Sequence, residues 1–434
     1  MNLHALLGAR AAAGRPVRAG LIGAGKFGSM FLSQVPSTPG LLVTAIADLS
    51  PDRARAACQT VGWDEDRIAA TAFVEDGRAL AAREDVEVVV DATGSPAAGI
   101  AHALAAIGNG KHVVMVNVEA DVLAGPALAR RARAAGVVYA MAYGDQPALV
   151  SEMVDWARAA GFRVQAAGKG TKYLPAYHKV TPDAVWPHYG LSAEQARAAG
   201  MNSQMFNSFL DGTKSAIEMA AIANACDLGV PADGLSFPPC GVDDLAHVLR
   251  PRAAGGQVDG EGMVEVVSSL ERDGRPVFRD LRWGVYVVFE APNDYAAACF
   301  RQYGLPTDSS GRYAAMYKPF HLIGLELGIS VLSAALRGEP TGHSRVFRGD
   351  AVAVAKRPLA VGETLDGEGG YTVWGKLVPA ARSVAMRALP IGLAHGVALV
   401  RPVAEGAILT RDDVAPLPAG ATLDLRRETE AMAG

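Results

Sequence analysis

Residues 20–30 read GLIGAGKFGSM, and this stretch decides the fold of the first part of the chain. It places Gly23-x-Gly25-x-x-Gly28 between an apolar, strand-like run and a helix-like run. Glycines at this spacing allow a tight turn and a close approach of the backbone to a pyrophosphate, which sits at the N-terminus of the helix. The stretch therefore predicts a dinucleotide site, and an ordinary strand-turn-helix without a ligand is the alternative.

The next apolar run, residues 41–48, ends on Asp48. An acidic residue at this place accepts a hydrogen bond from the ribose 2′-hydroxyl of NAD. It repels the 2′-phosphate of NADP unless a base such as Arg53 compensates, so both NAD and NADP stay open. Ligands of open parallel sheets bind beyond the carboxyl ends of the strands. The remaining residues that we predict for the cofactor site are Lys26, Phe27, Thr93, Gly94 and Asn117.

Strand-like and helix-like runs alternate from residue 17 to residue 150, which predicts a parallel sheet covered by helices on both faces. Residues 262–291 read as strands of an open antiparallel sheet, and residues 321–338 read as a helix that packs back on the first domain. After residue 340, short apolar runs alternate with Gly and Pro turns. We predict an α/β protein with a helical arm (1–16), a Rossmann dinucleotide-binding domain (17–150), an α+β catalytic and dimerisation domain with an open sheet (151–340) and a small β-rich domain (341–434).

The composition excludes several classes of partner. The 434 residues are half hydrophobic and carry a formal net charge of −4 with no basic face, so nucleic acid is not expected. The four cysteines are scattered, as is typical of reduced core residues in a cytoplasmic protein. Residues 1–16 resemble a short amphipathic helix more than a signal peptide, and no apolar run is long enough to predict a membrane span.

Residues 214–226 predict a helix that is apolar nearly all round and should therefore be buried. Three charges stand at its beginning, Asp211, Lys214 and Glu218, and we predict that they carry catalysis. A lysine and a carboxylate in a dry site can pass a proton to or from a substrate oxygen while hydride moves at the adjoining carbon. The alternative is that Asp211 is an N-cap and that Lys214 and Glu218 form an i,i+4 pair on a solvated edge.

Residues 168–175, GKGTKYLP, place lysines between glycines. Backbone N–H groups and ammonium groups in such a loop suit a phosphate or carboxylate of the substrate, although a surface turn is the alternative. The residues predicted to bind substrate are Lys169, Thr171, Lys172, His178, Lys318 and His321. Zinc spacing motifs are absent. A divalent cation such as Mg²⁺ or Mn²⁺ stays open, with Asp211, Glu218, Glu290, Asp294 and Asp308 as candidate ligands.

The sequence resembles two protein families. The strings DATG (91–94) and HVVMVN (112–117) resemble the Rossmann domain of homoserine dehydrogenases, but VNVE (116–119) lacks one lysine of that family, which argues against homoserine as substrate. Longer strings resemble the 1-deoxy-D-xylulose 5-phosphate reductoisomerase-like proteins, and the C-terminal segment resembles their SAF domain. These strings are GLIGAGKFGSMF, GKGTKYLP, MFNSFLDGTKSAIEMAAIANA, FRDLRWGVYVVFEA and PFHLIGLELGISVL.

The second resemblance implies a homodimeric enzyme of isoprenoid precursor synthesis. Such an enzyme converts 1-deoxy-D-xylulose 5-phosphate to 2-C-methyl-D-erythritol 4-phosphate with NAD(P)H. Lys214, Asp211 and Glu218 would then handle hydroxyl protons, and Lys169 and Lys172 would anchor the phosphate. Two alternatives remain open: a dehydrogenase of another sugar, polyol or homoserine-like substrate, and a nucleotide-sensing protein without turnover.

Overall fold

The computed structural model describes residues 2–433, which divide into two compact units. Unit 1 comprises residues 2–152, 321–345 and 420–429, and unit 2 comprises residues 153–320, 346–419 and 430–433. No helix of the described residues is long and apolar enough to cross a membrane.

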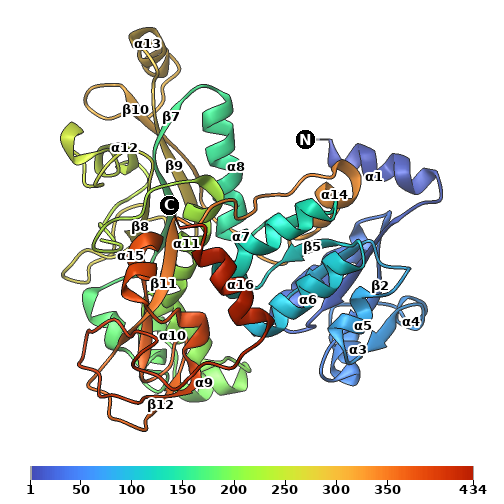
Figure 1. Ribbon diagram of the computed structural model, residues 1–434. Helices are drawn as coiled ribbons and strands as arrows, with labels where there is room; N and C mark the ends of the chain where they lie inside the picture. The colour runs from blue at the N-terminus through green and yellow to red at the C-terminus, as the bar shows by residue number, and fades with distance from the viewer. Residues whose placement is uncertain (1, 434) are drawn as a thin grey trace. The chain divides into compact units, whose positions relative to one another are not determined.

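Unit 1 is built on a parallel six-stranded sheet with the order β3-β2-β1-β4-β5-β6. Figure 1 labels two of its strands, β2 and β5, in the blue and cyan part of the chain. The strands are β1 (Val17–Ile22), β2 (Leu41–Ala47), β3 (Ala72–Val74), β4 (Val88–Asp91), β5 (His112–Met115) and β6 (Tyr139–Met141). The connecting helices are α2 (Lys26–Gln34), α3 (Pro51–Thr60), α4 (Glu65–Ala69), α5 (Gly77–Ala81), α6 (Pro96–Gly108) and α7 (Val118–Ala134). The strand order reverses beside β1, where sheets of this type bind their ligands. The predicted α/β class and Rossmann sheet are confirmed.

Two helices from the ends of the sequence complete unit 1. The predicted N-terminal helix is present as α1 (Leu3–Ala12), with Leu3 and Leu7 buried in the core beneath the sheet. The helix predicted over 321–338 packs against the sheet as expected, but α14 (Gly328–Arg337) is shorter. The chain turns first, because Gly324 has a φ of 81° and lies where any Cβ would come within 2.6 Å of Met30.

Unit 2 contains a four-stranded sheet with the order β10-β9-β7-β8. Its strands are β7 (Arg163–Thr171), β8 (Met263–Ser268), β9 (Val285–Glu290) and β10 (Tyr313–Lys318). The prediction of an antiparallel sheet is correct for β7–β9 and β9–β10, but β7 and β8 are parallel. The long connection between them, residues 172–262, includes four α-helices, and parallel strands need such a crossover.

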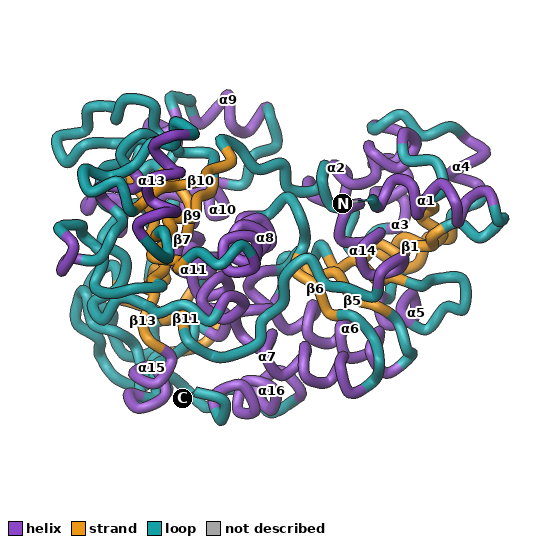
Figure 2. Tube along the Cα trace, turned by 90° about the horizontal axis from the view of Figure 1, so that it is seen from above, coloured by secondary structure: helices purple, strands orange, loops and turns teal. Residues whose placement is uncertain are grey.

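The helix with the unusual apolar surface is α11 (Thr213–Cys226), and every residue in it except Lys214 is buried. One side packs on β7 and β8, and another side packs on β11 (Gly349–Ala355) and β13 (Val373–Pro379) from the C-terminal part of the chain (Figure 2). Asn224 holds the second contact, because its side chain donates to the carbonyl of Gly349 at 3.1 Å and accepts from the N–H of Arg348 at 2.7 Å. The helix is therefore apolar all round because it lies between two layers.

Unit 2 contains further helices and strands besides its four-stranded sheet, α11, β11 and β13. They are α9 (Ala193–Ala198), α10 (Ser203–Leu210), α12 (Leu245–Val248), α13 (Asp294–Gln302), β12 (Thr364–Asp366), β14 (His395–Ala398) and α15 (Ala380–Met386). Two further helices, α8 (Gln146–Ala159) and α16 (Ala421–Glu430), contain residues of both units. The predicted boundaries at residues 16, 150 and 340 remain predictions. Residues 346–419 group with the rest of unit 2, whereas residues 420–429 group with unit 1.

Candidate functional site

The glycine turn of unit 1 connects β1 to α2. Its three positions differ in backbone conformation and in the space that a side chain would have. Gly23 has a φ of 95°, and Gly28 lies so close to the turn that a Cβ would be 2.1 Å from the carbonyl oxygen of Gly23. Gly25 is the N-cap of α2, with an ordinary φ of −72° and no atom within 4 Å of its Cβ position. The first and last glycines thus shape the turn, and the middle one leaves space where a pyrophosphate approaches the helix.

Asp48 is buried directly after β2 and is bound to this turn. Its Oδ2 accepts from the N–H of Ala24 at 3.0 Å, and its Oδ1 accepts from the N–H of Ser50 at 3.0 Å. The guanidinium of Arg53 lies 2.6 Å from the same Oδ1 and is 64% exposed. The carboxylate expected at the ribose is therefore partly neutralised by a cation that is itself accessible.

Polar residues also meet at the carboxyl ends of β4 and β5. Asp91 accepts from the hydroxyl of Thr93 at 2.7 Å and lies 2.6 Å from Nδ1 of His102. Asn117 donates to the Thr93 hydroxyl at 3.3 Å and caps α7, and Gly94 is exposed beside Thr93. The structure thus brings Thr93, Gly94 and Asn117 together, which fits one rim of a dinucleotide site.

Three other residues of unit 1, Lys26, Phe27 and Asp121, differ from one another in how far they are buried. Lys26 is exposed in the first turn of α2, whereas Phe27 is half-buried and packs against the hydrophobic core, so its cofactor contact remains a prediction. Asp121 is buried in α7. It accepts from Tyr139 at 3.0 Å and from Ser344 at 2.8 Å, and burial raises its pKa to about 6.

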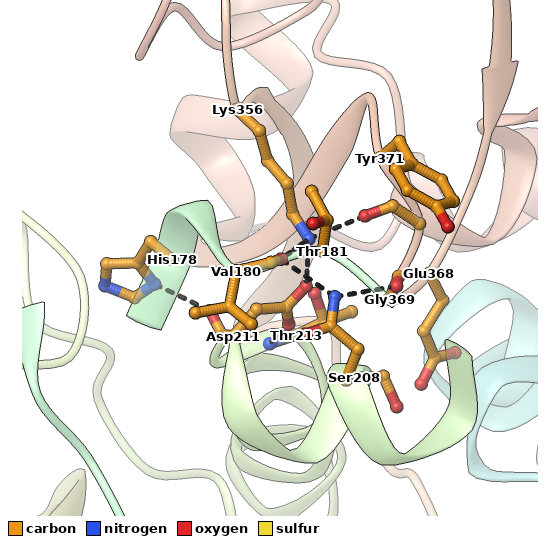
Figure 3. A network of polar contacts seen from close by, with 12 residues as sticks. His178, Val180, Thr181, Ser208, Asp211, Thr213, Lys356, Glu368, Gly369 and Tyr371 are labelled. Atoms are coloured by element: carbon orange, nitrogen blue, oxygen red, sulfur yellow. Dashed lines mark hydrogen bonds and ion pairs between the residues drawn. The ribbon is translucent and has the colours of Figure 1, made fainter. Parts of the chain in front are cut away.

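In unit 2, the corner between α10 and α11 is built around Asp211 (Figure 3). This side chain is fully buried, its Oδ1 accepts from the N–H of Thr213 at 2.9 Å, and its Oδ2 lies 2.8 Å from Nζ of Lys356. Burial raises the pKa of Asp211, and the Lys356 ammonium and Thr213 oppose that rise. Both carboxylate oxygens of Asp211 thus face groups inside the protein, and its exchange of protons with a substrate remains a prediction.

Lys356 follows β11 and has no local signal in the sequence that marks it as part of the site. Its ammonium donates to the carbonyls of Val180 at 2.8 Å and Gly370 at 2.7 Å, in addition to the contact with Asp211. Two carbonyl oxygens and one carboxylate oxygen thus surround the ammonium and offset the loss of its hydration on burial.

His178 lies beside the same corner, and both of its ring nitrogens have partners. Nδ1 donates to the carbonyl of Asp211 at 2.6 Å, and Nε2 lies 3.0 Å from the hydroxyl of Tyr173. The ring stacks on Trp374 with centroids 3.8 Å apart. Burial lowers the pKa of His178 to about 4, so the imidazole is neutral at pH 7. The substrate-binding role of His178 remains a prediction.

Lys169 and Glu218 form a buried ion pair between β7 and α11. Lys169 lies in a strand and not in the glycine loop that the sequence suggested. Gly168 and Gly170 are needed for close packing, because a Cβ at either would lie 1.9 Å from a backbone carbonyl oxygen, of Glu265 and Leu281 respectively. Lys169 thus forms a charge pair next to the first turn of α11, and its role as an anion anchor remains a prediction.

The other predicted substrate residues are spread over both units. Thr171 ends β7, and Lys172 donates to the carbonyl of His188 while burial lowers its pKa. Lys318, in unit 2, lies with its ammonium 5.7 Å from the ring centroid of Phe320. His321, in unit 1, has Nε2 3.1 Å from the side-chain nitrogen of Gln146.

The candidate metal ligands do not assemble into a site. Among residues 2–433, no three His, Cys, Asp or Glu side chains are grouped so that they could hold a metal ion. Each of the five candidate carboxylates is paired with a base: Asp211 with Lys356, Glu218 with Lys169, Glu290 with Arg163, Asp294 with Arg312 and Asp308 with Arg250. These residues therefore do not fit a resident divalent cation.

Two family models match the chain. Residues 23–142 match the NAD-binding domain of homoserine dehydrogenase, and residues 144–327 match the model described as the catalytic domain of oxidoreductase DRL. Both matches end before the C-terminal segment, whose similarity to SAF domains remains a prediction. No curated protein sequence matches the chain.

Several solved structures show limited similarity. A 3-ketoreductase from Actinomadura kijaniata, in complex with NADP, is 21% identical over 36% of this chain and 50% of its own, with a TM-score of 0.27. A probable dehydrogenase from Thermotoga maritima is 15% identical over 75% and 90%, with a TM-score of 0.39. The 1-deoxy-D-xylulose 5-phosphate reductoisomerase from Zymomonas mobilis, in complex with NADPH, is 17% identical over 48% and 58%, with a TM-score of 0.36. The chain thus spans about half the length of the first of these proteins.

The glycine turn, Asp48 and the carboxyl ends of β4 and β5 lie within the match to an NAD-binding domain. Helix α11 and strand β7 lie within the match to an oxidoreductase catalytic domain. The protein is an NAD(P)-dependent oxidoreductase.

Proposed function

We propose that this oxidoreductase acts on a small phosphorylated ketose, converting 1-deoxy-D-xylulose 5-phosphate to 2-C-methyl-D-erythritol 4-phosphate with NAD(P)H. The observation that carries the proposal is the first turn of α11. Lys214 is the one residue of this helix that is not buried. It directly follows the buried α10–α11 corner, and Glu218, four residues later on the helix, forms the buried pair with Lys169. The family match over residues 144–327 supports this place as the catalytic part of the chain.

The chain's own residues have distinct parts in this proposal. Bound NAD(P)H supplies the hydride. The Lys214 ammonium donates a hydrogen bond, and then a proton, to the substrate carbonyl oxygen as the adjoining carbon is reduced. The Glu218–Lys169 pair places a fixed, desolvated dipole one turn away, where it acts without reorganisation. Lys172, whose pKa burial lowers, lies three residues beyond Lys169 and is our proposed contact for the phosphate.

A product assay tests the proposal. The protein is incubated with 1-deoxy-D-xylulose 5-phosphate and NADPH, oxidation of NADPH is followed by absorbance, and the product is identified by carbon NMR. We expect a branched polyol phosphate and a loss of about 100-fold or more in kcat for Lys214→Ala. No oxidation of NADPH with this substrate, with or without Mg²⁺ or Mn²⁺, would remove the assignment.

A second candidate is a dehydrogenase of another sugar or polyol that reduces without rearrangement. It is favoured by the pairing of all five candidate metal ligands with bases, because a carbon–carbon rearrangement needs an electrophile for the enolate. The same NMR spectrum separates the candidates, since this one gives an unbranched product. The non-catalytic alternative is set aside because the matched model describes an oxidoreductase catalytic domain. A homodimer, which light scattering would measure, remains a proposal.

A further inference from the structure

The C-terminal segment 346–419 lies outside both family matches, yet three of its residues hold the α10–α11 corner. Lys356 contacts the carboxylate of Asp211 at 2.8 Å. The N–H of Gly375 donates to the hydroxyl of Thr213 at 2.8 Å, and Trp374 stacks on His178, which donates to the carbonyl of Asp211. Asp211 and Thr213 are the anchored residues on either side of Gly212, and Lys214 follows next in the chain.

The α10–α11 corner depends on contacts with the C-terminal segment because the N-cap of α11 is a glycine without a capping side chain. Gly212 is the N-cap of α11 with a φ of 92°, and it has no side chain with which to bind the free N–H groups of the helix. Asp211 supplies the missing acceptor to the N–H of Thr213. A buried carboxylate loses its hydration, and the Lys356 ammonium 2.8 Å away is the opposite charge that offsets this cost.

We propose that Lys356 is a positioning residue of the reaction and that the C-terminal segment is a working part of the catalytic unit. Lys356 fixes the carboxylate of Asp211, Asp211 fixes the first N–H of α11, and this sets the direction in which Lys214 leaves the helix. The inference rests on the proposed function in one respect, namely that Lys214 touches the substrate.

The polar contacts around Lys356 include a second feature that supports its positioning role. Asn207, on α10, is fully buried and donates to the carbonyls of Val180 at 2.9 Å and Gly369 at 2.8 Å. Val180 therefore receives hydrogen bonds from both Lys356 and Asn207, so α10, the loop after His178 and the C-terminal segment are fixed to one another (Figure 3). Such cross-links order side chains that a merely apolar contact would leave free to shift.

The test compares Lys356→Met, the double variant Lys356→Met/Asp211→Asn, and the control Lys179→Met. Lys179 also pairs with a residue of the C-terminal segment, Glu405, but on the surface. We expect Lys356→Met to lower kcat about 100-fold, as for a misplaced catalytic group, with the KM for NADPH unchanged. The double variant removes the unpaired buried charge, so it should recover the unfolding midpoint but not kcat. The control should match the wild type.

A second measurement does not depend on the substrate. The rate at which an amine-acylating reagent modifies Lys214, quantified by mass spectrometry of the peptide, should rise in both Lys356 variants and stay at the wild-type rate in Lys179→Met. If the ketose phosphate is not turned over but this rate changes, the proposed substrate fails and the positioning role stands. Wild-type kcat in the double variant with any active substrate, or an unchanged modification rate, would overturn the role.

Discussion

At the scale of single residues, charged side chains have effects that depend on what lies beside them. Asp48 alone would favour the 2′-hydroxyl of NAD, but Arg53 is bound to it and remains 64% exposed. An exposed guanidinium next to the ribose is also a partner for a 2′-phosphate. The pair therefore favours NADP more than the carboxylate alone would.

Replacing Arg53 with Ala should shift the cofactor preference from NADPH toward NADH. A charge-assisted hydrogen bond contributes about 1.5–3 kcal/mol, so the ratio of kcat/KM for the two cofactors should change by about 10-fold to 100-fold. Arg55→Ala is the matched control, because Arg55 lies on the same helix but over the ring of Phe73, at 4.2 Å. An unchanged ratio in Arg53→Ala would mean that Arg53 only neutralises Asp48.

Asp121 predicts a pH dependence of stability. Its pKa is raised to about 6 in the folded state, so between about pH 4 and pH 6 the folded protein holds a proton that the unfolded chain has released. The free energy of unfolding therefore falls as the pH rises through this window, by up to about 3 kcal/mol, and the contribution is lost above it. Asp121→Asn should flatten this part of the curve.

The measurement for Asp121 is urea unfolding at half-unit steps from pH 4 to pH 8. The exposed Asp52→Asn on α3 is the control and should follow the wild-type curve. If Asp121→Asn kept the wild-type slope between pH 4 and pH 6, another buried group would be responsible. Tyr139 and Ser344 should be left unchanged in these variants, because both donate to the carboxylate.

At the scale of elements, the turn between β1 and α2 contains one glycine that close packing requires and another that faces open space. A Cβ at position 28 would meet the carbonyl of Gly23 at 2.1 Å, whereas a Cβ at position 25 would have no neighbour within 4 Å. The same chemical change at two positions three residues apart should therefore have different consequences.

We expect Gly28→Ala to destabilise the protein by several kcal/mol, since backbone atoms cannot move aside cheaply. Gly25→Ala should leave the unfolding midpoint unchanged but weaken NADPH binding at least about 10-fold, because the methyl group occupies the space of the pyrophosphate. Thermal unfolding and fluorescence titration with NADPH measure the two effects. Equal affinity in Gly25→Ala and the wild type would place the pyrophosphate elsewhere.

At the scale of the whole molecule, neither unit is a continuous piece of sequence. Residues 346–419 belong with unit 2 and residues 420–429 with unit 1. A fragment of residues 1–340 therefore removes part of both, and it removes β11 and β13, which cover one side of α11. An apolar helix side that loses its cover favours aggregation.

We expect the fragment of residues 1–340 to lack a cooperative unfolding transition in urea, whereas the full chain shows one. Near-ultraviolet circular dichroism should show the loss of fixed aromatic packing, in particular around His178 and Trp374. A fragment that unfolds cooperatively and binds NADPH like the full chain would show that residues 341–434 form an independent domain.

The parts of the protein that depend on local order could be predicted from the amino-acid sequence. The glycine spacing, the acidic residue after the second strand and the alternation of apolar runs predicted the Rossmann sheet and its cofactor turn. The apolar composition of residues 214–226 predicted a buried helix. These features follow from backbone geometry and hydrophobic periodicity within short windows, which a sequence displays directly.

The pairing of the buried charges could not be predicted from the sequence, because it is set by the packing of distant segments. Lys356 contacts Asp211 across 145 positions of sequence, and Lys169 pairs with Glu218 rather than presenting its ammonium to an anion in a glycine loop. The parallel pairing of β7 with β8 and the enclosure of α11 by the C-terminal strands likewise depend on long-range packing. A buried charge is stabilised by whichever opposite charge the fold brings within a few ångströms, and nothing in its sequence neighbourhood specifies that partner.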